Sequence, residues 1–133
     1  MVNENQTGKT DVLALVDDLF FQSKLAETAR NLGISLKTVS TGEALVDALE
    51  SVPAGQAKAG GPGLIVVDLN ARRGPLEAIE QLQRSGNPIP IVGFLSHVQT
   101  ALAERAQAAG CKQVMPRSKF TMNLAEILSQ ARS

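Results

Sequence analysis

The stretch LIVVDLN, residues 64–70, decides the fold that we expect for this chain. Four apolar residues run directly into a carboxylate, Asp68, and a Gly-Pro step follows at Gly74-Pro75. A run this short and continuously apolar is typical of a strand buried on both faces, as at the centre of a parallel sheet. Asp68 would then lie at the carboxyl end of the strand, where open α/β sheets place their ligand sites.

Four more short apolar runs share this character, and a helical pattern of apolar residues follows each of the five runs. Strands are predicted at 12–16, 36–39, within 64–70, at 91–95 and at 113–115. Helices are predicted at 22–32, after a Ser40 or Thr41 cap, at about 75–84, at 98–109, and from a Thr121 cap to about Ala131. This five-fold alternation predicts a doubly wound (βα)5 α/β fold, with a five-stranded parallel sheet covered by helices on both faces.

The length of 133 residues predicts one domain. We expect residues 11–133 to form it behind a flexible leader at 1–10, with 53–63 as a surface connection rich in Gly, Ala and Pro. The leader is polar, and no apolar run approaches the roughly 18 residues of a membrane span. A cytoplasmic protein is therefore expected.

Charge and composition exclude several classes of partner. Thirteen basic and thirteen acidic residues balance, and the chain has no Tyr and no Trp. Nothing here favours nucleic acid or an anionic membrane as a partner. Cys111 is the one cysteine, which excludes an internal disulfide and a cysteine metal cluster.

Three carboxylates follow strands that meet at one edge of the predicted sheet. Asp17 and Asp18 follow the first strand, and Asp68 ends the third. Carboxylates this close repel one another unless a cation or protons neutralise them. Oxygen ligands without His or Cys suit Mg²⁺. They also disfavour a flavodoxin-type nucleotide site, where a phosphate would meet two carboxylates after the first strand.

With an acidic pair after the first strand and an aspartate at the end of the third, the chain from 11 to 131 resembles the receiver domain of bacterial response regulators. The resemblance implies a sheet of strand order 2-1-3-4-5. It also implies that Asp17 and Asp18 bind Mg²⁺, that Asp68 accepts a phosphoryl group from a histidine kinase, and that Asn70 offers its backbone carbonyl to the metal.

Other parts of the receiver pattern are altered. Where the family has a Lys after the fifth strand, this chain has Arg117, and Lys119 is a nearby substitute. The Thr or Ser after the fourth strand corresponds to Leu95, with Ser96 next to it, and the aromatic residue of the fifth strand corresponds to Val114. Arg and Lys are not interchangeable at such a site. The chain thus resembles an atypical or pseudo-receiver, with Ser96, Arg117 and Lys119 as candidate phosphoryl contacts.

These features predict a receiver-like signalling domain that is not an enzyme and acts through protein contacts. The partner would be a histidine kinase, a downstream effector, or a second copy bound through the helix 98–109 and the strand 113–115. Two alternatives stay open. One is an Mg²⁺-dependent receiver phosphorylated on Asp68, and the other is a flavodoxin-like module that binds a small molecule.

Several of these residues also have plainer interpretations. Asp17-Asp18 can be a helix-capping turn, and Ser96 can cap the helix that follows it. Arg72-Arg73 are expected to be solvated loop charges; the alternative is that they offset the acidic pocket and make a metal unnecessary.

Overall fold

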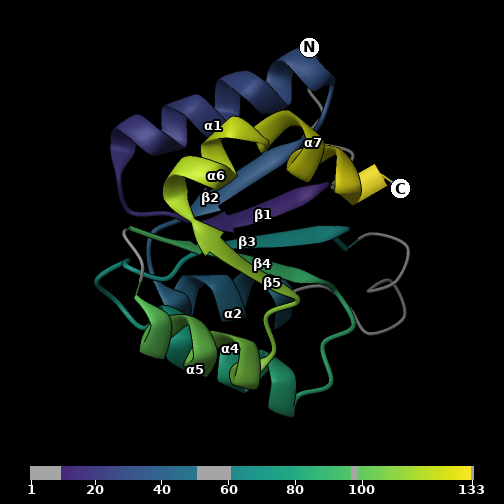
Figure 1. Cartoon of the computed structure of the whole chain (residues 1–133). Helices are drawn as coiled ribbons and strands as arrows, with labels where there is room; N and C mark the ends of the chain where they lie inside the picture. The colour runs from purple at the N-terminus through teal and green to yellow at the C-terminus, as the bar shows by residue number, and fades with distance from the viewer. Residues whose placement is uncertain (1–9, 51–60, 97–98, 133) are drawn as a thin grey trace.

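The computed structural model describes residues 10–50, 61–96 and 99–132. The expected leader, apart from residue 10, and most of the 53–63 connection lie outside these ranges. Five parallel strands form one sheet in the order β2-β1-β3-β4-β5 (Figure 1). The strands are β1 (Val12–Leu15), β2 (Leu36–Val39), β3 (Leu64–Asp68), β4 (Ile91–Leu95) and β5 (Gln113–Pro116). The predicted fold class and strand order are both confirmed.

Helices cover both faces of this sheet (Figure 1). On one side lie α1 (Leu19–Leu32), α6 (Arg117–Met122) and α7 (Leu124–Ser129), followed by a short 3₁₀ helix (Gln130–Arg132). On the other lie α2 (Gly42–Glu50), α4 (Pro75–Arg84) and α5 (Thr100–Ala109).

Two apolar cores result, one under each layer of helices. Side chains of β3 alternate between them: Leu64 and Val66 pack with α1 and α7, whereas Ile65 and Val67 pack with α2 and α4. Successive residues of a strand point to opposite faces, so a strand between two helical layers must be apolar at every position. This is why the run at 64–67 is continuous.

Three helix starts differ from the predictions, and one of these helices, α5, begins at Thr100 after Gln99 rather than at 98. Helix α1 begins at Leu19, earlier than the expected Gln22, because the Asp18 side chain caps it. The predicted Thr121 cap is wrong: α6 begins at Arg117, directly after β5, and Thr121 lies inside it. The side chain of Phe120, within α6, is fully buried against the core beneath α1.

Candidate functional site

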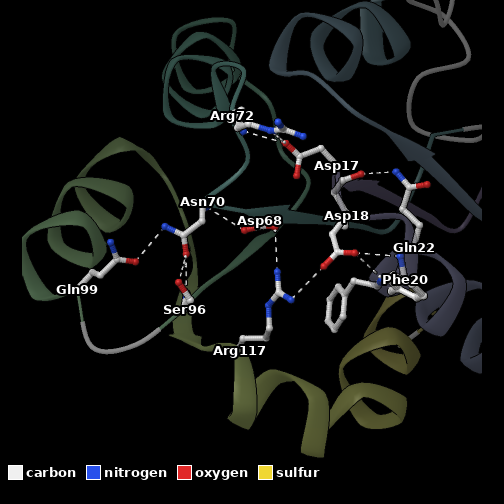
Figure 2. Close-up of polar contacts among 12 residues, drawn as sticks. Asp17, Asp18, Phe20, Gln22, Asp68, Asn70, Arg72, Ser96, Gln99 and Arg117 are labelled. Atoms are coloured by element: carbon white, nitrogen blue, oxygen red, sulfur yellow. Dashed lines mark hydrogen bonds and ion pairs between the residues drawn. The ribbon is translucent and has the colours of Figure 1, made fainter.

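Asp68 is the last residue of β3, and only 2% of its surface is exposed. Both of its carboxylate oxygens have partners (Figure 2). Oδ1 accepts a hydrogen bond from the backbone N–H of Asn70 at 2.9 Å, and Oδ2 lies 3.3 Å from Nη2 of Arg117. The carboxylate is therefore held from two sides by the protein itself.

Asp18 belongs both to helix α1 and to this site. Its Oδ1 accepts hydrogen bonds from the backbone N–H groups of Phe20 (2.9 Å) and Phe21 (3.4 Å), as an N-cap does. Its Oδ2 lies 3.5 Å from Nη1 of Arg117. The hydrogen bond from Phe21, followed by those from Phe20 and Arg117, lowers the pKa of the Asp18 carboxyl. The capping interpretation is confirmed for this residue, and its second carboxylate oxygen faces Arg117.

Asp17 makes its contacts elsewhere, with the loop after β3. Its Oδ2 accepts a hydrogen bond from the backbone N–H of Arg72 at 2.9 Å and lies 3.6 Å from Nε of the same residue. The Arg72 side chain is 87% exposed. It is thus a solvated loop charge, as expected, and it also pairs with one carboxylate of the acidic edge.

Arg117 is the first residue of α6, and its guanidinium links Asp18 to Asp68 (Figure 2). The guanidinium carbon lies 4.7 Å from the ring centre of Phe21 and 5.5 Å from that of Phe94. Phe94 in turn stacks on Phe120, with 4.5 Å between ring centres. A cation over aromatic faces is attracted by their negative charge distribution. Aromatic side chains below and carboxylates beside it therefore fix Arg117 in place.

Burial dominates the electrostatics of Asp68. Loss of solvation raises the pKa of its carboxyl, and the charges of Asp17 and Asp18 raise it further. The hydrogen bond from Asn70 and the positive charge of Arg117 act in the opposite direction without cancelling the effect of burial. The folded protein therefore disfavours the ionised form of the Asp68 carboxyl.

Asn70 joins the loop after β3 to the loop after β4. Its Oδ1 accepts two hydrogen bonds from Ser96, one from the backbone N–H at 2.6 Å and one from the hydroxyl at 3.0 Å. Its Nδ2 donates to Oε1 of Gln99 at 3.0 Å. The Ser96 hydroxyl thus bonds to the Asn70 side chain rather than to Asp68.

The remaining predicted site residue, Lys119, is exposed on α6. Within the described ranges it forms no ion pair with a carboxylate. Of the two basic residues considered for this position, Arg117 is the one that reaches the carboxylates.

Three functional neighbours were not predicted from the sequence: Phe21, Phe94 and Gln99. Phe94 pairs with Asp68 in the β3–β4 register, and Phe21 follows the Asp18 cap by three residues. An aromatic residue near the end of a strand predicted to neighbour β3 was the available signal for Phe94. Gln99 carried none.

The arrangement does not fit a divalent cation. Asp18 gives one oxygen to the helix cap and the other to Arg117, while Asp17 bonds to Arg72. In the part of the chain that the structure describes, no three His, Cys, Asp or Glu side chains gather in a way that could hold a metal ion. The ligand roles of Asp17, Asp18, Asp68 and Asn70 stay predictions from the resemblance.

Comparisons with known proteins bear on the fold. No protein-family model matches the sequence, and no curated protein matches it significantly. Among solved structures, the signal receiver domain of NarL from Mycobacterium tuberculosis is 15% identical, with a TM-score of 0.70 over 94% of this chain and 98% of that one. A response regulator receiver protein from Pseudoalteromonas atlantica is 12% identical, with a TM-score of 0.73 over 91% and 95%.

A third similar structure was solved with a partner protein. The receiver domain of the Saccharomyces cerevisiae response regulator Ssk1, in complex with the histidine phosphotransfer protein Ypd1, is 23% identical. Its TM-score is 0.71 over 91% of this chain and 87% of that one. None of the helices in the described ranges has the length and apolar character needed to cross a bilayer. The chain has the fold of response regulator receiver domains.

Proposed function

We propose that this chain is a receiver-like signalling domain that acts through protein contacts, is not an enzyme, and does not use Asp68 as a phosphoryl acceptor. The observation that carries the proposal is the double engagement of Asp68. One oxygen accepts the Asn70 N–H and the other faces the Arg117 guanidinium. A carboxylate nucleophile needs an oxygen that is free to approach phosphorus, and it also needs groups that stabilise the transferred oxygens.

The neighbouring groups support the same proposal. A receiver would use a hydroxyl after the fourth strand to contact the phosphoryl group, but the Ser96 hydroxyl bonds to Asn70. The position of the reporting aromatic residue holds Val114, whose half-buried side chain packs against the core. We infer that the acidic edge serves as an ion-pair network that holds the ends of β1, β3 and β5 together.

A protein partner remains part of the proposal, because receiver folds do bind proteins, as the Ssk1 domain binds Ypd1. The predicted homodimer through α5 and β5 has weaker support. The large exposed apolar side chains of the described residues are Leu19, Phe20, Leu32 and Met122, which lie on α1 and α6. Stable dimer interfaces bury large apolar side chains at their centre. We therefore expect no dimer through the α5 and β5 face.

The phosphorylation test uses the full chain with acetyl phosphate, and separately with beryllofluoride, in the presence of Mg²⁺. We expect intact mass to show no phosphorylated species and amide NMR spectra to show no change that depends on Asp68. The Asp68→Ala variant is the control, and a receiver known to be phosphorylated verifies the reagents. A phosphorylated species in the wild type that Asp68→Ala lacks would establish the competing function, a phosphorylatable receiver.

A further inference from the structure

We propose that Arg117 is the resident cation of the acidic edge: it excludes a divalent metal from Asp18 and Asp68, and its neutral replacement converts the edge into a metal site. The inference goes beyond the proposed function, because it concerns which cation neutralises the carboxylates. Its test measures metal binding directly and uses no phosphoryl donor.

The two arms of the guanidinium contact the oxygens that a bridging metal ion would need. Nη1 lies 3.5 Å from Oδ2 of Asp18, and Nη2 lies 3.3 Å from Oδ2 of Asp68. A metal ion ligated by both oxygens would have to approach each of them to about 2.0–2.1 Å, as Mg²⁺ does. The guanidinium nitrogens already face those two oxygens, so the two cations compete for one place.

The charges of the edge lead to the same conclusion. Asp17, Asp18 and Asp68 contribute three negative charges, and the guanidinium groups of Arg72 and Arg117 contribute two positive ones. With Arg117 in place, a divalent ion would meet one uncompensated negative charge. Without it, the ion would meet two, one of them on the buried Asp68. Nearby opposite charge is what draws a cation to a site. Removing Arg117 leaves Asp18 and the buried Asp68 uncompensated side by side, whereas removing Arg72 leaves only Asp17 uncompensated.

Packing makes Arg117 hard to displace. Its guanidinium carbon lies over the rings of Phe21 and Phe94, which belong to α1 and β4. Its Nε is a buried nitrogen without a hydrogen-bond partner among the described residues, as expected of a group pressed against aromatic side chains. If a metal expelled the guanidinium, these ring faces would be exposed to water. Apolar contact thus holds the cation in place, in addition to its ion pairs.

The side chain is nevertheless 35% exposed, so the position can be reached from solvent. A shorter or neutral side chain at position 117 would leave Asp68 buried with no cation beside it. We therefore expect solvent ions to enter the edge once the guanidinium is gone.

The test is a titration of the full chain with Mg²⁺, followed by amide NMR shifts of Phe20 and Asn70, and with Mn²⁺, followed by paramagnetic broadening of the same amides. Wild type is expected to show no saturable change. Arg117→Gln is expected to bind both ions, with an apparent affinity at least about tenfold above that of the control. Adding Asp68→Asn to Arg117→Gln is expected to abolish this binding.

Arg72→Gln is the matched control, because it removes one guanidinium from the same edge and leaves Arg117 between Asp18 and Asp68. Arg117→Met is the second variant if Arg117→Gln unfolds, since its apolar stem still covers Phe21 and Phe94. Saturable binding by the wild type would overturn the proposal, and so would equal binding by the 117 and 72 variants. Neither result depends on phosphorylation, so failure here is distinct from failure of the proposed function.

Discussion

Nη2 of Arg117 lies 3.3 Å from Oδ2 of Asp68, although the two residues are 49 positions apart in the chain. Asp68 ends β3 and Arg117 follows β5, and these two strands are separated in the sheet by β4. The guanidinium therefore reaches across the end of β4, passing over Phe94. One ion pair thus ties two non-adjacent strands to the same edge.

We predict that Asp68→Asn becomes more stable relative to the wild type as pH rises. Burial raises the pKa of Asp68, so the folded protein holds this proton more tightly than the unfolded chain. Wild-type stability contributed by this group is therefore present at low pH and is lost as pH rises through the folded pKa. Asparagine cannot ionise and lacks this loss. Urea unfolding of both proteins at about pH 4 and about pH 7 measures the difference.

Asp18 has the opposite pH dependence, since its pKa is lowered and its stabilising effect is lost as pH falls. It is present in both proteins and largely cancels in the comparison. Asp47→Asn, which removes a carboxylate from the exposed surface of α2, is the control for the change of net charge. A difference between Asp68→Asn and wild type that does not grow with pH would contradict the dominance of burial.

The aromatic support of Arg117 can be tested with two phenylalanines. Phe94 is fully buried and stacks on Phe120, so Phe94→Ala is expected to lower the free energy of unfolding by about 3–5 kcal/mol. Phe20 is 90% exposed, and Phe20→Ala is expected to change it by less than about 0.5 kcal/mol. Denaturant unfolding compares them, and Phe94→Leu gives a milder version. Equal losses at the two positions would show that the ring beneath Arg117 is not part of the core.

Gly42 allows the start of α2 to approach the loop before α4. A Cβ at position 42 would lie 2.1 Å from the carbonyl oxygen of Gly74, and the Gly42 N–H donates to the carbonyl of Arg73 at 2.7 Å. Gly42→Ala must push this loop outward. We expect a loss of about 1–3 kcal/mol in the free energy of unfolding, together with a shift of the Arg72 amide that reports on its bond to Asp17.

The matched control for this substitution is Glu43→Ala, at the next and exposed position of the same helix. Its effect should stay within about 0.5 kcal/mol, with no shift of the Arg72 amide. If Gly42→Ala leaves that amide unmoved, the close approach does not position the loop beside the acidic edge.

Asn70 is expected to be the link that holds the loop after β4. Asn70→Ala removes three hydrogen bonds, two from Ser96 and one to Gln99, whereas Ser96→Ala removes only the hydroxyl bond. Hydrogen exchange of the Ser96 amide should therefore accelerate in Asn70→Ala and stay close to the wild-type rate in Ser96→Ala. Because the contacts are exposed, global stability should change by about 1 kcal/mol or less. Equal exchange rates in the two variants would refute the link.

Much of the fold could be predicted from the sequence, because its elements obey local rules. The helix Pro75–Arg84 and the strand Ile91–Leu95 were predicted with the observed bounds. The Gly74-Pro75 step marks the start of the helix, and a short apolar run marks the strand. The helix α6 was not predicted, because no side-chain cap marks its start: it follows β5 directly, and Phe120 within it packs into the core beneath α1.

The candidate site was predicted as a set of residues but not as a set of contacts. Asp18, Asp68 and Arg117 do meet, whereas Asp17 bonds to Arg72, and Ser96 bonds to Asn70. Spacing along the chain indicates which strand end carries a side chain. It does not indicate which partner that side chain faces, because the direction depends on loops and on neighbours from other strands.

The sequence alone determined that five apolar strands alternate with helices and that a carboxylate ends the central strand. Only the tertiary structure decided what neutralises that carboxylate. The strand order and the β3–β4 register place Phe94 beside Asp68, and the packing of α1 adds Phe21. The guanidinium of Arg117 packs over these two rings, beside the carboxylates of the acidic edge. The physical reason is that an ion pair depends on distance in space, and folding sets that distance between residues that the chain keeps far apart.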